Sequence, residues 1–362
     1  MSHRLKIAFF GSSLCSAYWN GSATYYRGLI RAFAERGHRI TFYEPDVYER
    51  QQHRDMPDPY WARVVVYQPT DEDALDALER AEQSDLIIKC GGVGAFDDLL
   101  EAAVLELKKP GTLVAFLDME PSATLDRIHN DPEDPFRPLI PEYDFILTRG
   151  GGAPIANAYL AAGAVECAPI YPALDAHTHF PVPPEERFAA DLGFLGDRTS
   201  DIEARVEEFF LRSAAKTPEL KFLLGGNGWH EKPLPSNVNY PGHIYTHEHN
   251  GFNCSPRAVL SVNCASAARC GCLPPQPLFE AAGAGACVIT DKWDGIEMFL
   301  EPGREVLVAE NGDQVIEHLR NLTPARAREI GRAASSRLLA EHTYAHRAGQ
   351  LQKVLEGQKV AV

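Results

Sequence analysis

The chain has 362 residues, of which 45% are apolar and 9% aromatic, and this predicts two packed domains rather than one. Its formal net charge of −15 at pH 7 disfavours a nucleic-acid partner, because proteins that bind nucleic acids normally present a basic surface. No uncharged apolar run reaches the roughly 18 residues that cross a bilayer, so no membrane span is predicted.

The first residues lead directly into a predicted strand, and their apolar stretch is too short for a secretion signal. The eight cysteines are scattered, and Cys90, Cys167 and Cys287 stand inside apolar runs, which is typical of buried free thiols. We therefore expect a cytoplasmic, reducing compartment.

In the first half of the chain, apolar runs alternate with helical patterns, which indicates a parallel sheet with crossover helices. A helix follows the first strand and ends near Arg36, where Gly37 supplies a left-handed stop. Another helix occupies the 70s and early 80s behind acidic first-turn residues. Strands are predicted at residues 6–10, 39–43, 85–89, 113–117 and 144–148.

The proline-rich stretch HTHFPVPPEER, residues 177–187, changes the composition and is typical of an interdomain linker. A second series of strands follows it, and a long helical pattern from Pro324 to about Leu355 closes the chain with an interruption near residues 342–344. The strands of this second series are predicted at residues 192–196, 220–224, 259–262, 287–290 and 306–309.

Residues 274–312 are the most informative about function. Pro277 suits the first position of a helix, and Glu280 then falls in the opening turn, where free N–H groups and the helix dipole favour an anion such as a diphosphate. An ionised Glu280 can accept hydrogen bonds from two neighbouring ribose hydroxyls. The alternative is a helix packed closely on a parallel sheet, with Glu280 as a partner of the helix dipole.

This segment, with the order F-E-A-A-x-x-G-A-x-x-I-T-D-x-W-x-G-I-E, resembles the donor-binding half of group-1 glycosyltransferases, and more narrowly their spore-maturation-protein-like branch. Motifs along nearly the whole chain, in the same order, are similar to that branch. They are residues 20–29 (NGSATYYRGL), 42–47 (FYEPDV), 118–121 (DMEP), 151–154 (GGAP), 194–198 (FLGDR) and 331–348.

The resemblance implies a GT-B fold, an α/β architecture in which two Rossmann-like doubly wound domains face each other across a cleft. The second domain would hold a nucleoside-diphosphate sugar as the donor substrate, with no separate cofactor, and the acceptor is unidentified. We accordingly expect an N-terminal acceptor-side domain at 1–176, a linker at 177–190, a nucleotide-sugar domain at 191–341 and a tail helix at 342–362 that crosses back to the first domain.

Donor-binding candidates lie where predicted strands end, because ligands of open parallel sheets bind beyond the carboxyl ends of the strands. Arg198 is the first choice for the diphosphate, since a guanidinium can grip two phosphate oxygens, and a surface salt bridge to Asp201 is its alternative role. Relatives commonly carry an arginine near the position of Pro277. The full set of donor candidates is Gly11, Gly196, Arg198, Gly226, Arg269, Phe279, Glu280 and Gly295.

Asp118 and Asp46 are the carboxylates that follow strands of the first domain, and either could accept a hydroxyl proton from the acceptor. A helix cap or a turn is the equally weighted alternative for each. Relatives tend to have a histidine where this chain has Ser22, so a base at that position is missing here.

No metal site is predicted, because the pairs His177/His179 and His247/His249 and the cysteines at 264–272 lack the spacing of a structural zinc site. The sequence also lacks a G-x-G-x-x-G fingerprint after its first strand, which weakens a dehydrogenase assignment. A nucleotide-sugar epimerase on the same fold, or a non-catalytic nucleotide-sugar-binding protein, stays open beside the glycosyltransferase.

Overall fold

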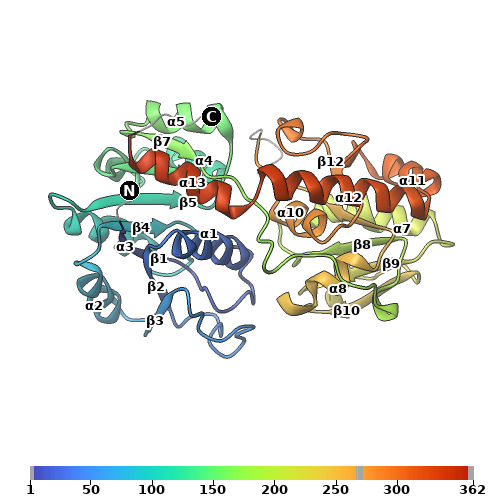
Figure 1. Cartoon of the computed structure of the whole chain (residues 1–362), viewed down its shortest axis with the longest axis horizontal. Coiled ribbons are helices and arrows are strands. Elements are labelled where there is room, and N and C mark those ends of the chain that lie inside the picture. The colour runs from blue at the N-terminus through green and yellow to red at the C-terminus, as the bar shows by residue number, and fades with distance from the viewer. Residues whose placement is uncertain (1–3, 266, 268–271, 358–362) are drawn as a thin grey trace. The chain divides into compact units, whose positions relative to one another are not determined.

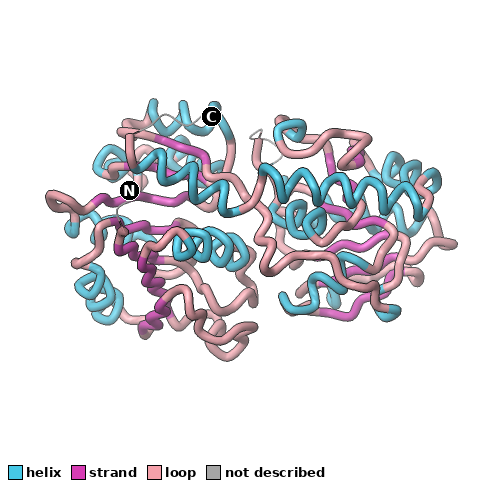
Figure 2. Tube along the Cα trace, viewed as in Figure 1, coloured by secondary structure: helices cyan, strands magenta, loops and turns pink. Residues whose placement is uncertain are grey.

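Two separate parallel sheets organise the chain in the computed structural model, which describes residues 4–265, 267 and 272–357. The chain forms two units: unit 1 contains Met1–Tyr171 and Tyr344–Val362, and unit 2 contains Pro172–Thr343. In both units helices flank a central sheet, as the tube in Figure 2 shows.

Unit 1 is built on a seven-stranded sheet whose paired strands are all parallel, in the order β3-β2-β1-β4-β5-β6-β7. Its central strands are fully buried runs such as Leu86–Cys90, as expected for a sheet covered on both faces. The strands are β1 (Lys6–Phe10), β2 (Arg39–Pro45), β3 (Arg63–Tyr67), β4 (Leu86–Cys90), β5 (Leu113–Asp118), β6 (Phe145–Thr148) and β7 (Cys167–Pro169).

The last helix of the chain belongs to unit 1 and packs on its first helix; α1 (blue) and α13 (red) lie side by side in Figure 1. Gly28 makes this approach possible, because a Cβ built on it would lie only 2.0 Å from the Tyr344 ring. The helices of unit 1 are α1 (Ala23–Glu35), α2 (Asp71–Ala81), α3 (Asp97–Ala103), α4 (Pro121–Asn130), α5 (Gly152–Ala161) and α13 (Tyr344–Leu355).

Unit 2 repeats the scheme with six parallel strands in the order β10-β9-β8-β11-β12-β13. They are β8 (Leu192–Leu195), β9 (Phe222–Gly225), β10 (Val238–Gly242), β11 (Ala258–Ser261), β12 (Val288–Asp291) and β13 (Leu307–Ala309). The helices are α6 (Glu203–Val206), which continues through a π-helical turn (Glu207–Leu211) into α7 (Arg212–Lys216), then α8 (His249–Cys254), α10 (Gln276–Gly283), α11 (Gly312–Asn321) and α12 (Pro324–Glu341).

Short 3₁₀ helices complete the two units. They are Val104–Leu107, Arg137–Glu142, Glu186–Phe188, Trp229–Glu231, Thr246–Glu248 and Ile296–Met298.

Three strands that the sequence analysis does not predict, β3, β7 and β10, all lie at sheet edges. The edge strands β3 and β10 are partly exposed, so their hydrophobic patterns are weak; β10 alternates between half-buried and exposed residues and contains Pro241. The edge strand β7 is buried but has only three residues. Among the described strands, the ten predicted ones are present with boundaries shifted by at most two residues.

The proline-rich stretch 177–190 lies within unit 2, because that unit begins at Pro172. Backbone N–H groups of this stretch donate to side chains of α8 and its C-terminal end: Phe180 to Asn250, Val182 to Cys254 and Glu185 to Ser255. The stretch is thus fixed to unit 2 over much of its length. The chain passes between the units at 171/172 and 343/344.

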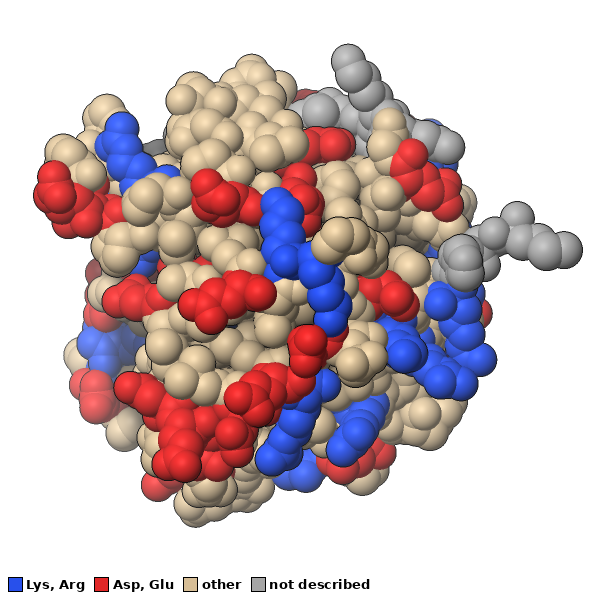
Figure 3. Space-filling model, turned by 90° about the vertical axis from the view of Figure 1, so that its left-hand side faces the viewer, with Lys and Arg blue, Asp and Glu red and all other residues tan. Residues whose placement is uncertain are grey.

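Charge on the surface follows the acidic composition. On the face drawn in Figure 3, acidic side chains form several groups with lysines and arginines between them, so positive charge is interrupted by carboxylates. Among the described helices, none combines the length and the apolar composition needed to cross a bilayer.

Candidate functional site

The strand order of unit 2 reverses direction between β8 and β11, which is the switch point where open α/β sheets bind ligands. Two glycines predicted for the donor site meet there, one after β8 and one after β9. A Cβ on Gly226, which has φ +121°, would lie 2.2 Å from the carbonyl oxygen of Gly196. The indole Nε1 of Trp229 donates to the same carbonyl at 2.8 Å. The structure therefore brings Gly196 and Gly226 together and leaves no room for a side chain between them.

A buried carboxylate, that of Asp291, lies at the same edge of the sheet and connects the ends of β11 and β12. Asp291, the last residue of β12, is fully buried and accepts a hydrogen bond from the backbone N–H of Asn263 at 3.0 Å. Arg205 of α6 donates to its other oxygen at 2.5 Å. Burial raises the pKa of Asp291, while the bonds from Asn263 and Arg205 act in the opposite direction.

Three polar atoms around this carboxylate are buried and make no hydrogen bond within the described chain: Oγ of Ser261, Nδ2 of Asn263 and Nε of Arg205. Each can donate, and an unsatisfied buried donor is costly. Ser261 ends β11 and pairs with Thr290, the neighbour of Asp291, while Asn263 lies in the loop after β11 and Arg205 lies on α6. An acceptor oxygen of a ligand bound at this edge would satisfy any one of these donors. Sequence reasoning missed them because only the strand ends, not the direction of these side chains, can be inferred from the pattern.

Arg198, predicted to hold the diphosphate, lies beside this edge but is engaged by carboxylates. Its backbone N–H donates to Asn227, and its guanidinium pairs with Glu203 at 2.9 Å and Glu231 at 2.7 Å. The sequence analysis gives an ion pair with Asp201 as the alternative role, and in the structure the guanidinium pairs with Glu203 and Glu231. A phosphate at Arg198 would have to replace them or join them.

Glu280 lies in the second turn of α10, since the helix begins at Gln276, and not in its opening turn as predicted. Its carboxylate is nearly buried, with 9% of the side chain exposed, and lies between two histidines. The distances are 3.8 Å to Nε2 of His179 and 3.9 Å to Nδ1 of His249. Both histidines escaped the sequence analysis as neighbours of Glu280, because they stand far from it along the chain.

The other donor candidates of unit 2, Phe279, Gly295 and Arg269, do not share one environment. Phe279 is fully buried and its ring packs edge-on against Phe299 at 5.6 Å, which is a core position. Gly295 has φ +86° and would place a Cβ 2.8 Å from the sulfur of Cys272, so a glycine is required there. Arg269 lies outside the described residues.

In unit 1, Asp118 ends β5 and is 1% exposed. It accepts hydrogen bonds from the backbone N–H of Glu120 at 2.9 Å, from the hydroxyl of Thr124 at 3.1 Å and from the Tyr159 hydroxyl. Burial raises the pKa of Asp118 to about 6, against the effect of these three donors. These bonds tie the enclosed carboxylate to Glu120, the residue before α4, and to Thr124 within α4.

Asp46 follows β2, is half-buried, and its N–H donates to Tyr67 at 2.8 Å. Gly11 follows β1 and packs so closely that a Cβ would lie 2.5 Å from the Phe42 ring. Glu44, near the end of β2, was not predicted for the site. It is fully buried and accepts hydrogen bonds from the Ser13 hydroxyl at 3.0 Å and from the Leu14 N–H at 2.6 Å. Glu44 thereby shapes the loop after β1.

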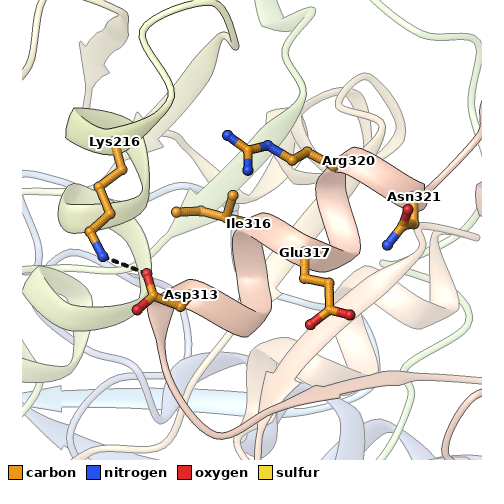
Figure 4. Close-up of a pocket in the computed structure, with 6 residues that line it drawn as sticks. All are labelled: Lys216, Asp313, Ile316, Glu317, Arg320 and Asn321. Atoms are coloured by element: carbon orange, nitrogen blue, oxygen red, sulfur yellow. Dashed lines mark hydrogen bonds and ion pairs between the residues drawn. The ribbon is translucent and has the colours of Figure 1, made fainter.

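A surface hollow of about 480 Å³ lies between α7 and α11, drawn in Figure 4. Lys216 reaches across it to Asp313 at 2.5 Å, and both side chains are exposed. None of the site residues predicted from the sequence lines it. The charges of this pair compensate each other, so the hollow is not part of the candidate site.

Comparisons with known proteins agree with this geometry. Residues 198–353, which include α6, β11, β12 and α10, match the family described as glycosyl transferase-like. A search of curated proteins finds no match.

Solved structures resemble the chain over almost its full length. A sucrose-phosphate synthase from Thermosynechococcus elongatus is 15% identical with a TM-score of 0.69, covering 98% of this chain and 99% of that one. HepE of Anabaena, solved with UDP-glucose, is 11% identical with a TM-score of 0.67, covering 98% and 100%. An α-glucosyltransferase solved with UDP and a 13-mer DNA is 10% identical with a TM-score of 0.67, covering 98% and 100%.

At these identities the structural likeness establishes the fold: two Rossmann-like units of the GT-B type, as predicted. The family match of residues 198–353 lies within this fold, and the two findings together support a glycosyltransferase of the group-1 kind. Neither the epimerase nor the non-catalytic alternative is favoured by these findings.

Proposed function

We propose that this protein transfers a sugar from a nucleoside-diphosphate sugar to an acceptor, and that unit 2 holds the donor at the switch point between β8 and β11. The observation that carries the proposal is the group of three buried, unsatisfied donors at that edge, on Ser261, Asn263 and Arg205. A diphosphate offers several acceptor oxygens and the negative charge that a guanidinium favours. UDP-glucose is the first donor to test, because HepE of similar fold was solved with it.

In this proposal Glu280 accepts hydrogen bonds from the ribose hydroxyls, as in the glycosyltransferases that the segment resembles. The support is its place on α10 within the matched residues 198–353. Basic side chains and buried donors, rather than a resident metal or organic cofactor, would stabilise the leaving diphosphate. Donor binding should then persist in the presence of a chelator.

The family branch, the cellular location and the class of acceptor are part of the same proposal. The ordered motifs of the sequence support the spore-maturation-protein-like branch, and the described cysteines, all free, support a cytoplasmic, reducing location. The acceptor is not a nucleic acid in this proposal, although some similar structures contain DNA, because the net charge of −15 opposes a polyanion.

The experiment is a calorimetric titration of UDP, GDP, ADP and their glucose conjugates, followed by an assay for free nucleotide released from any donor that binds. Saturable binding of one nucleoside diphosphate and slow hydrolysis of its sugar conjugate support the proposal. Conversion of the donor sugar to an epimer would replace it by the epimerase. Absence of binding to every nucleotide would refute it.

A further inference from the structure

Three metal-ligating side chains from distant parts of unit 2 converge on one point. His179 lies in a turn, where its backbone N–H donates to the carbonyl oxygen of Asp175. His249 is the first residue of α8, and Glu280 lies within α10. One ligand atom from each of the three side chains lies within 4.8 Å of the others. The two imidazole rings are nearly parallel, with centroids 5.9 Å apart.

His179 is the unusual member of this group. The residue is 1% exposed, and neither of its ring nitrogens has a hydrogen-bond partner among the described residues. Its Nε2 lies 3.8 Å from Oε1 of Glu280, which is beyond hydrogen-bond distance. A buried imidazole left in this state is costly, and buried polar groups are normally satisfied by some partner.

His249 has its ring orientation fixed from the other side. Its Nε2 lies 3.3 Å from the carbonyl oxygen of Ile244, and because a carbonyl can only accept, this nitrogen carries the proton. In the neutral ring Nδ1 then presents a lone pair toward Oε2 of Glu280 at 3.9 Å. Histidines that bind metals are oriented in this way, with the second N–H donating to a backbone carbonyl. A lone pair and a carboxylate that face each other are stabilised by a cation between them.

The distances fit a small ion. A zinc ion with bonds of about 2.0–2.2 Å holds the ligand atoms of a tetrahedron roughly 3.3–3.6 Å apart. The two histidines lie 3.8 Å from Oε1 and 3.9 Å from Oε2 of Glu280, and the three ligand atoms lie within 4.8 Å of one another, so the side chains would move closer together when an ion binds. The donor set of two imidazoles and one carboxylate disfavours Mg²⁺ and Ca²⁺, which prefer oxygen ligands.

We propose that His179, His249 and Glu280 form a binding site for a divalent transition-metal ion, with Zn²⁺ the ion whose preferences they match best. Three protein ligands leave a fourth position open to water or to another ligand. The site shares Glu280 with the proposed donor site but does not require a nucleotide, so zinc binding is tested without nucleotide and nucleotide binding is tested in EDTA.

The test uses the full-length protein, stripped with EDTA, desalted and titrated with Zn²⁺ by calorimetry and with Co²⁺ by visible absorption. We expect one ion per chain, and binding weakened more than about 10-fold in His179→Leu and in His249→Leu. The matched control is His247→Leu, since His247 is exposed and only two residues from His249. This control should bind as the wild type does.

The cobalt spectrum excludes the cysteines as an alternative source of binding, because thiolate ligands add a charge-transfer band that imidazole and carboxylate do not. A thiolate band, the lack of any saturable site, or wild-type affinity in both histidine variants would overturn the proposal. If His179→Leu fails to fold, His249→Leu and Glu280→Gln carry the same test. Nucleotide titrations in EDTA report separately on the transferase function.

Discussion

Arg205 and Asp291 form an ion pair at the carboxyl edge of the unit 2 sheet, with Nη2 and Oδ2 2.5 Å apart. The carboxylate is fully buried and the arginine 28% exposed, so the pair spans the boundary between the sheet and its surroundings. Asp291 also holds the backbone of Asn263, and the Arg205 guanidinium lies over the Phe209 ring at 4.7 Å. The backbone of Asn263 and the guanidinium of Arg205 are thereby held in place before a ligand arrives, which is the arrangement that favours strong electrostatic stabilisation.

The Ser261 hydroxyl should contribute to ligand affinity but not to the free energy of unfolding. Because it makes no hydrogen bond in the described chain, Ser261→Ala should leave the free energy of unfolding unchanged or raise it slightly. The same change should weaken binding of the nucleoside diphosphate by about 0.5–1.5 kcal/mol, or roughly 2- to 12-fold, as the loss of one hydrogen bond does. Urea unfolding and calorimetric titration measure the two effects.

Ser213 provides the contrast for this prediction. Its hydroxyl is also buried but donates to the carbonyls of Phe209 at 2.9 Å and Gly312 at 3.1 Å. Ser213→Ala should therefore lower the free energy of unfolding by about 1 kcal/mol and leave nucleotide affinity unchanged. If Ser261→Ala behaved like Ser213→Ala, the Ser261 hydroxyl would have a structural role only.

Features that depend on neighbouring residues could be predicted from the sequence, whereas contacts between residues far apart along the chain could not. The central strands were predictable, because their apolar runs are continuous and end in glycine or acidic residues, as at Gly196 and Asp291. The local motif was sufficient to name Glu280 as a donor-binding candidate. Its histidine neighbours were not, because His179 lies 101 residues before it and the contact depends on how the turn after Asp175 packs against α8 and α10. No local periodicity encodes such a contact.

Asp118 should make stability depend on pH in a definite direction. Its pKa is raised from 3.8 to about 6, mainly by burial, so the folded state binds the proton more tightly than the unfolded state. The stability that this proton contributes is fully present below pH 3.8 and is lost as the pH rises through about 6. The shift corresponds to about 3 kcal/mol at 1.36 kcal/mol per pKa unit. Asp118→Asn should therefore flatten the fall in unfolding free energy between pH 4 and 6.5, measured by urea titration at successive pH values.

The control for this slope is Glu120→Gln, because Glu120 is exposed and only two residues away. It should keep the wild-type pH dependence. Glu101, whose pKa burial raises to about 7, contributes in the same direction, so a residual slope should persist in Asp118→Asn and decrease further on adding Glu101→Gln. An unchanged slope in Asp118→Asn would show that this carboxyl titrates at an ordinary pH.

Glu280→Gln tests the ribose contact with little change of shape. Loss of a charged acceptor should weaken binding of a nucleoside diphosphate by about 1–3 kcal/mol, or roughly 5- to 150-fold, measured by calorimetry in EDTA. The matched control is Glu297→Gln, an exposed glutamate within the same matched segment, which should bind normally. Equal affinities for the two variants would remove Glu280 from the donor site while leaving the Ser261 prediction intact.

Competition between zinc and nucleotide follows if Glu280 serves both ligands. A carboxylate coordinated to Zn²⁺ beside His179 and His249 has fewer lone pairs to offer a ribose diol, so saturating Zn²⁺ should lower nucleotide affinity, and nucleotide should lower zinc affinity by the same factor. His179→Leu supplies the control, because zinc also complexes free nucleotide in solution and that effect is identical in both proteins. We expect nucleotide affinity to fall with Zn²⁺ in the wild type and to fall less in His179→Leu. Identical zinc dependence in the two proteins would mean that the metal and the ribose do not share this carboxylate.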